Sequence, residues 1–293
     1  MPPSGGVVVE QDVRPVGPYR LPRPRPDGIT RRRGTALVRV IHLGDEPAVV
    51  RVWPVSGAVR LRAEARTEDA AAHAVERMRF ALNLDHDLRP FQRRFKNDPL
   101  IGPVIRRNPW LRPFRRAMPF EALTWAITEQ LIETTRAFAI QRRLTYRYGR
   151  RSACGTLRDA PAPAALAARA PYELAALDLA AKRALALIKA SREIDRGRVD
   201  LTQHEPAWKR LLSISNIGSW TIDCLAFHGQ GRDDMLPAGD LAYVKLVGRM
   251  AGLGRRATEA EVREFFAPYE EFAGLAGTYM LRAAAERPYL RAV

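Results

Sequence analysis

Apolar and polar residues alternate in three short stretches near the N-terminus, which predicts β-strands. The stretches are TALVRVIHL (35–43), PAVVRVWPV (47–55) and GAVRLRAEA (57–65), and breaks at 44–46 and 54–57 separate them. This pattern is typical of an antiparallel sheet with one solvated face and hairpin connections. A helical spacing follows in EDAAAHAVERMRFAL (68–82). We therefore expect one helix to pack on the sheet.

After about Leu84 the spacing of apolar residues is helical, and Pro, Gly or Asp interrupts it. Residues 119–148 predict two helices ended by Gly149, and further helices are expected at 160–168, 178–192, 262–266 and 270–285. Thr258 and Glu261 form a capping-box pattern before one of them. The expected fold is α+β and mostly α. It divides into a Pro/Arg-rich segment (1–33), partly extended or disordered, a sheet-plus-helix domain (34–90) and a helical region with two subdomains (91–293).

A short turn joins two helical patterns at 205–228, within LLSISNIGSWTIDCLAFHG (211–229). It predicts a helix-hairpin-helix, in which Asn216, Ile217 and Gly218 supply residues tolerant of positive φ. The second helix would run from Trp220 to Phe227. Such a turn leaves backbone N–H groups free at a helix start, where they suit a phosphate.

The charge balance also favours a polyanionic partner. The 293 residues include 48 basic and 32 acidic side chains, a net charge of +16. Genome composition could explain the preference for arginine over lysine, but it would not explain the excess of basic over acidic residues. Nucleic acid is therefore the favoured partner.

Cysteine content and hydropathy indicate an intracellular protein. Cys154 and Cys224 are the only cysteines, too few for a disulfide framework or a four-thiolate cluster. No apolar run reaches the ~18 residues that span a bilayer, and no secretory signal is evident. No His, Asp or Glu set has metal-ligand spacing. We expect a cytoplasmic, nucleoid-associated protein that binds no membrane, metal or cofactor.

Two motifs resemble those of a known enzyme family. IGSWT (217–221) is followed by Asp240 within LPAGD, and FEALTWAITEQLI (120–132) contains a Gln-Leu pair. Together with a β domain before the helices, they resemble the helix-hairpin-helix DNA glycosylase superfamily. The likeness is closest to the 3-methyladenine DNA glycosylase II family and covers most of the chain from about Leu84 to Leu281.

The resemblance implies a catalytic role for Asp240. Cleavage of the C1′–N bond builds positive charge on the sugar, which a nearby carboxylate stabilises. By itself, an aspartate after Pro-Ala-Gly would be interpreted as an N-cap. Trp220 stands where bifunctional members place a catalytic lysine, so the resemblance implies a monofunctional enzyme. Trp220 would stack on an extruded base, although simple core packing is the alternative.

Other residues receive roles from the same resemblance. Gln130 is assigned to the base pocket and Leu131 to a duplex wedge, although the spacing of Leu131 also fits core packing. Two positions depart from the family pattern: Cys224 replaces a pocket aromatic, and Tyr279 is a possible substitute for a tryptophan. The expected DNA-phosphate contacts are Asn216, Ile217, Gly218, Ser219 and Lys245, where Lys245 is otherwise a surface cation.

The sequence therefore predicts a monomeric, monofunctional DNA glycosylase of base excision repair. Its substrate would be double-stranded DNA with a flipped damaged base, most simply an alkylated purine. Two alternatives remain open at this stage. In the first, the protein is a non-catalytic DNA-binding or lesion-sensing protein that uses the hairpin. In the second, it is a glycosylase that removes oxidised or deaminated bases.

Overall fold

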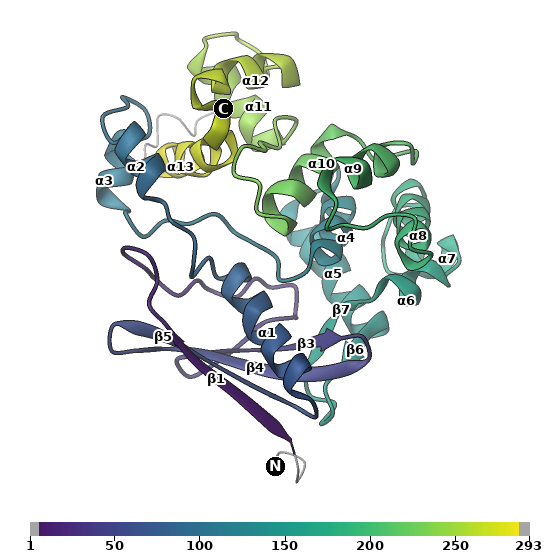
Figure 1. Ribbon diagram of the computed structural model, residues 1–293. Coiled ribbons are helices and arrows are strands. Elements are labelled where there is room, and N and C mark those ends of the chain that lie inside the picture. The colour runs from purple at the N-terminus through teal and green to yellow at the C-terminus, as the bar shows by residue number, and fades with distance from the viewer. Residues whose placement is uncertain (1–5, 287–293) are drawn as a thin grey trace.

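The computed structural model describes residues 6–286, and they form a sheet lobe and two helical lobes (Figure 1). The sheet lobe has five antiparallel strands in the order β1-β5-β4-β3-β2 with helix α1 against one face. Its elements are β1 (Val7–Val13), β2 (Arg31–Arg33), β3 (Ala36–Leu43), β4 (Glu46–Val55), β5 (Ala58–Ala65) and α1 (Glu68–Ala81). The three strands and the helix expected from hydropathy are confirmed.

Two strands of this sheet were not anticipated. β1 pairs with β5 from Val7 opposite Ala65 to Val13 opposite Val59, and β2 pairs with β3. The expectation that strands begin near Thr35 was wrong, because it overlooked VVVEQDV, whose β-branched residues favour an extended backbone. The first five residues of the predicted N-terminal segment lie outside the described residues.

The central helical lobe follows in the middle of the chain. It contains α4 (Pro119–Glu129), α5 (Thr134–Tyr148), β6 (Gly149–Arg151), β7 (Arg158–Pro161), α6 (Pro163–Ala167), α7 (Pro171–Ala175), α8 (Ala181–Asp195), α9 (His204–Leu212), α10 (Ser219–Cys224) and the π-helix η1 (Leu225–Gly229). The β6-β7 hairpin was not expected after Leu84. Gly149 is required at its start, since a Cβ there would lie 2.3 Å from the Asp159 carbonyl oxygen.

The terminal helical lobe is assembled from two distant parts of the chain (Figure 1). It contains α2 (Arg89–Phe95), α3 (Gly102–Arg107), α11 (Leu241–Met250), α12 (Glu259–Phe266), the 3-10 helix η2 (Ala267–Phe272) and α13 (Ala273–Glu286). Phe91 and Ile101 share one core with Leu246 and Phe266. The predicted capping box is present, because the Glu261 N–H donates to Thr258 Oγ1 and the Thr258 N–H to Glu261 Oε2.

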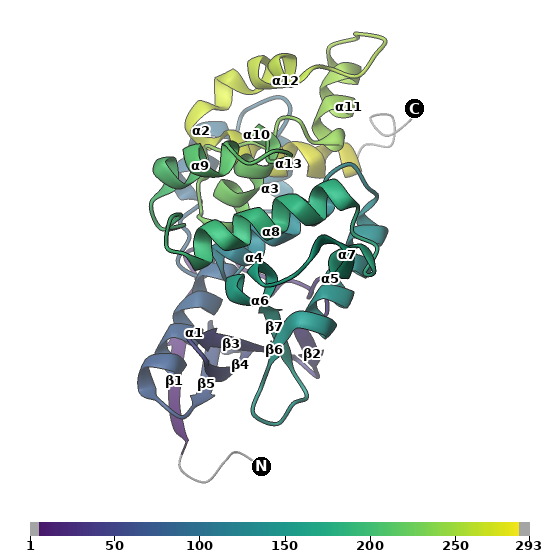
Figure 2. The same cartoon turned by 90° about the vertical axis from the view of Figure 1, so that its right-hand side faces the viewer.

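Buried ion pairs hold the sheet lobe against the central lobe. In Figure 2 the central lobe lies above the sheet lobe. The Arg39 guanidinium on β3 donates to Glu121 on α4 at 2.6 Å and to Asp159 on β7 at 3.2 Å. Arg116 pairs with Asp27 and also with Glu121 at 3.4 Å. A buried charge is costly unless it is paired, so this network fixes the relative position of the two lobes.

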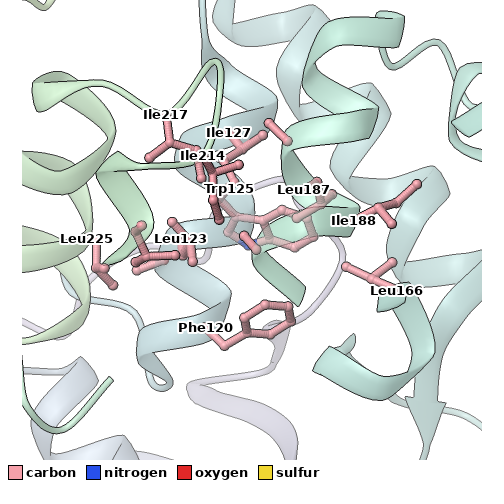
Figure 3. Close-up of a cluster of buried hydrophobic side chains, with 14 of the residues drawn as sticks. Phe120, Leu123, Trp125, Ile127, Leu166, Leu187, Ile188, Ile214, Ile217 and Leu225 are labelled. Carbon is pink, nitrogen blue, oxygen red and sulfur yellow. The ribbon is translucent and has the colours of Figure 1, made fainter. Parts of the chain in front are cut away.

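Each lobe has its own apolar core. The central core surrounds Trp125, which is packed against side chains of α4, α8 and the hairpin (Figure 3). Within residues 6–286, no helix is long and apolar enough to cross a membrane.

Candidate active site between the helical lobes

Buried apolar side chains anchor the turn between α9 and α10 to the central core. Ile214 and Ile217 are buried in the central core close to Trp125 (Figure 3). Asn216 has a φ of 68°, the left-handed conformation that asparagine tolerates better than most residues. Gly218 has a φ of −113°, so only Asn216 of the three predicted turn residues uses positive φ.

The start of α10 leaves backbone donors at the surface. The Ile217 N–H donates to the Ile214 carbonyl oxygen at 3.0 Å, and the next backbone bond within the turn is from the Thr221 N–H to the Gly218 carbonyl oxygen at 3.1 Å. The N–H groups of Gly218, Ser219 and Trp220 therefore precede the helical ladder. A Cβ on Gly218 would meet no atom within 4 Å, so the surface is open there. The Ser219 hydroxyl donates to Glu259.

Trp220 and Asp240 meet where the two helical lobes join. The indole Nε1 of Trp220, on α10, lies 3.4 Å from Asp240 Oδ2, at the start of α11. The other carboxylate oxygen, Oδ1, accepts from the Ala242 N–H at 2.8 Å and caps α11. Asp240 is therefore an N-cap and, with its second oxygen, a neighbour of Trp220.

The Gln-Leu pair of the FEALTWAITEQLI motif lies beside the hairpin. Gln130 Nε2 donates to the Asn216 carbonyl oxygen and to Thr221 Oγ1, both at 2.9 Å. Its amide therefore holds the end of α4 against the hairpin, which is a different role from the predicted base contact. Leu131 has a φ of 55° and an exposed fraction of 104%, so the core alternative is wrong. An exposed leucine in this strained conformation is typical of a functional position.

Comparisons with known proteins find similar sequences. The chain is 25% identical over 207 residues to a DNA-3-methyladenine glycosylase of Bacillus subtilis (strain 168), covering 68% of each chain. It is 33% identical over 169 residues to DNA-3-methyladenine glycosylase 2 of Escherichia coli (strain K12), covering 54% of this chain and 58% of the relative. No protein-family model matches the chain.

A solved structure has a similar fold. The 3-methyladenine DNA glycosylase from Archaeoglobus fulgidus superposes with a TM-score of 0.74 at 20% identity, over 88% of this chain and 89% of that one. In sequence the chain is similar to DNA-3-methyladenine glycosylases, and in fold it is similar to the Archaeoglobus fulgidus enzyme. The fold predicted for the family, a sheet lobe followed by two helical lobes, is confirmed.

Three other predicted site residues have different surroundings. The Cys224 side chain is 7% exposed, and burial, with the carboxylates of Glu129 and Asp240 nearby, raises the pKa of its thiol. Lys245 lies exposed on α11. Tyr279 is fully buried in the terminal core, where its hydroxyl donates to the Leu111 carbonyl oxygen at 2.8 Å. The prediction that Tyr279 lines the base pocket is therefore wrong.

Tyr279 lies away from the proposed site because the face of α13 that carries it packs against α2. The Tyr279 and Phe91 ring centroids are 5.0 Å apart. Helical spacing along α13 could not show which neighbour each face would meet. Among the described residues, no group of three His, Cys, Asp or Glu side chains could hold a metal ion.

A small cavity of about 30 Å³ lies beside Cys224, and most of its lining was missed by sequence reasoning. The nine lining residues are Arg25, Phe114, Arg116, Ala122, Trp125, Ala126, Glu129, Cys224 and His228. Arg25 and Phe114 lie in segments without periodicity, so no sequence signal marked them. Glu129 directly precedes the recognised Gln130, but its side-chain direction depends on where α4 ends. Of the nine lining residues, only Cys224 was assigned to the pocket from the sequence.

His228 enters this cavity from the π-helix η1. Burial lowers the pKa of its imidazole to about 3, with smaller contributions from Arg25, Arg115 and Arg116. The neutral ring lies with Nδ1 2.8 Å from the Phe114 carbonyl oxygen, so Nδ1 carries the hydrogen and Nε2 offers a lone pair. The widened turn of a π-helix is frequent at functional sites.

Proposed function

We propose that this protein is a monofunctional DNA glycosylase that hydrolyses the N-glycosidic bond of a damaged base in double-stranded DNA. The observation that supports it most is the pairing of Trp220 with Asp240 between the two helical lobes, 3.4 Å apart. The relatives named for 3-methyladenine favour alkylated purines as substrates. The net charge of +16 favours binding to the DNA backbone.

The reaction follows from the charge that develops on the sugar. As the C1′–N bond breaks, the deoxyribose becomes oxocarbenium-like, and the Asp240 carboxylate stabilises that positive charge. The same carboxylate orients the water that attacks C1′. An N3- or N7-alkylated purine is already cationic, so it departs without a strong general acid. The free base and an abasic site are the products.

Trp220 supports the monofunctional assignment. A glycosylase with lyase activity needs an amine nucleophile that forms a Schiff base with the sugar. At the hairpin position this chain has an indole, whose N–H faces Asp240. Lys245 lies on the exposed side of α11, five residues beyond Asp240. The expected product therefore retains an intact strand.

Three surface features support the proposed mode of DNA binding. The hairpin amides at Gly218, Ser219 and Trp220 would bind a backbone phosphate, as the amides at a helix start do. Leu131 would enter the duplex where the base leaves, because an apolar wedge offsets part of the unstacking cost. Lys245 would contact a second phosphate. We propose that the protein acts as a monomer at the nucleoid.

A lesion panel tests this function. The pure protein is incubated with duplexes that carry alkylated, deaminated or oxidised bases, and each product is divided between alkali treatment and none. We expect base release from the alkylated duplexes and strand breaks only after alkali. Strand breaks without alkali, or a borohydride-trapped covalent adduct, would contradict the monofunctional assignment. Lack of release across the whole panel would refute the enzymatic function.

The capping bond of Asp240 favours a second candidate, a DNA-binding or lesion-sensing protein without base chemistry. Asp240 Oδ1 accepts the Ala242 N–H as an ordinary N-cap does. This candidate predicts DNA binding without turnover. It also predicts that Asp240→Ala leaves DNA affinity unchanged while lowering stability by about 1 kcal/mol.

A further inference from the structure

A carboxylate forms part of the cavity beside Cys224. Glu129 is the last residue of α4, and its Oε1 accepts from Gln141 Nε2 on α5 at 2.8 Å. Gln141 is fully buried, so it fixes the direction of the Glu129 side chain. Within residues 6–286, no hydrogen bond or ion pair reaches the second oxygen, Oε2. A carboxylate held by one oxygen leaves the other for a ligand.

A planar cation lines this cavity. The Arg25 guanidinium carbon Cζ lies 3.9 Å from the centroid of the Phe114 ring, and Arg25 and Glu129 line the same cavity. Burial lowers the pKa of Arg25, with Arg116 adding to the shift, whereas Glu129 and Asp27 oppose it. No ion pair shorter than 4.0 Å joins Arg25 to a carboxylate among the described residues. Its guanidinium is stabilised mainly by the aromatic face and by the field of nearby carboxylates.

Cys224 connects this cavity to the proposed catalytic pair. Cys224 is on its wall, and Glu129 and Asp240 are the first two carboxylates that raise the pKa of the Cys224 thiol, after burial. Cys224 follows Trp220 by four residues, so the two side chains share one face of the helix. A base that leaves the sugar beside Asp240 would therefore meet Phe114, Trp125 and Glu129 next.

We propose that Glu129 is a specificity-determining residue whose carboxylate selects bases that carry a positive charge, and that the Arg25 side chain occupies their place until DNA binds. The guanidinium shows the chemistry that the cavity accepts, a flat delocalised cation stacked on an aromatic ring beside a carboxylate. An N-alkylated purine is likewise flat, delocalised and positively charged. The proposal rests on the proposed function and adds the basis of its base selection.

The small volume of the cavity requires Arg25 to move. About 30 Å³ accommodates about one water molecule, far less than a purine. Arg25 belongs to a segment without regular secondary structure, and this segment is anchored at Asp27, which pairs with Arg116, and at buried Ile29. The Arg25 side chain therefore leaves by rotating about its own bonds, with the backbone held in place.

The test compares one cationic and one neutral lesion under single-turnover conditions. Duplexes carry 7-methylguanine or hypoxanthine, and the proteins are wild type, Glu129→Gln and Glu76→Gln. Glu76 is an exposed residue of α1, so its variant loses the same charge far from the cavity. We expect Glu129→Gln to slow 7-methylguanine release about 10- to 100-fold and to leave hypoxanthine release within about threefold of wild type. Glu76→Gln should change neither rate.

A binding measurement separates this proposal from the proposed function, because it needs no catalysis. Tryptophan fluorescence follows binding of the 3,9-dimethyladeninium cation and of its neutral isostere 9-methyladenine. Wild type should prefer the cation, Glu129→Gln should lose that preference, and Arg25→Ala should bind the cation several-fold more tightly. If wild type releases no base from any lesion, the proposed enzymatic function is refuted. The preference for the cation over its neutral isostere can still be measured and tests the role of Glu129 by itself.

Two results would overturn the role of Glu129. The first is an equal loss on both lesions in Glu129→Gln, which would indicate that the side chain only supports the fold or positions α4. The second is an unchanged cation preference in that variant. Weaker cation binding by Arg25→Ala would show that Arg25 forms part of the cavity wall and does not occupy the place of the base.

Discussion

Asp240 caps a helix and has a proposed catalytic role, and the two are separable because each uses a different carboxylate oxygen. Oδ1 caps α11 by accepting the Ala242 N–H at 2.8 Å, and Oδ2 faces the Trp220 indole at 3.4 Å. Asparagine and serine cap helices about as well as aspartate, whereas alanine does not. Asp240→Asn and Asp240→Ser therefore remove the charge and keep the cap. Asp240→Ala removes both.

The two functions have different magnitudes. Loss of the cap costs about 1 kcal/mol of unfolding free energy. A carboxylate about 4 Å from the cationic sugar, at an effective dielectric constant of about 20, contributes roughly 4 kcal/mol to the transition state. That energy corresponds to about three powers of ten in rate. Stability should therefore separate alanine from the other two variants, and activity should separate all three from wild type.

The assay pairs urea denaturation with single-turnover base release from a 7-methylguanine duplex. We expect Asp240→Asn and Asp240→Ser to unfold within about 0.5 kcal/mol of wild type and to release base about 1000-fold more slowly. Asp240→Ala should be as slow and about 1 kcal/mol less stable. The reasoning is refuted if the asparagine and serine variants keep wild-type rates while alanine alone is impaired, because the cap would then be the whole function.

Two further predictions address the wedge and the buried histidine. Leu131→Ser should leave the urea midpoint unchanged, because the side chain is fully exposed. The variant should slow base release from duplex DNA more than from a single strand. Equal slowing on both substrates would exclude a wedge. His228 has a native pKa of about 3, below the ordinary value of 6.5, because of burial first and then Arg25, Arg115 and Arg116. Between these values the unfolded chain binds the extra proton, so stability falls as the pH falls, by at most about 1.4 kcal/mol per pH unit. In denaturation series from pH 7 to pH 4, the fall should be smaller for His228→Gln, and identical slopes would show that His228 is not responsible.

Local patterns determined much of this protein without tertiary information. Alternating residues at 35–65 placed three strands, and helical spacing at 68–82 placed α1. Thr258 and Glu261 marked a helix start with their own side chains. These signals are reliable because strand alternation and capping depend on residues adjacent in the chain. The motif around Trp220 and Asp240 likewise indicated a pair that the structure brings together.

Contacts between distant segments decided the rest. Arg25 lies over Phe114 and lines a cavity with Glu129 because buried ion pairs, those of Arg39 and of Asp27 with Arg116, hold distant segments together. Tyr279 was assigned to the pocket from its place along α13, but the packing of α13 on α2 buries it. The hydropathy of Leu131 fits a core residue, and only the end of α4 turns it into solvent. Side-chain direction at a helix end, and which face meets which neighbour, are set by packing between lobes, which no local pattern of residues encodes.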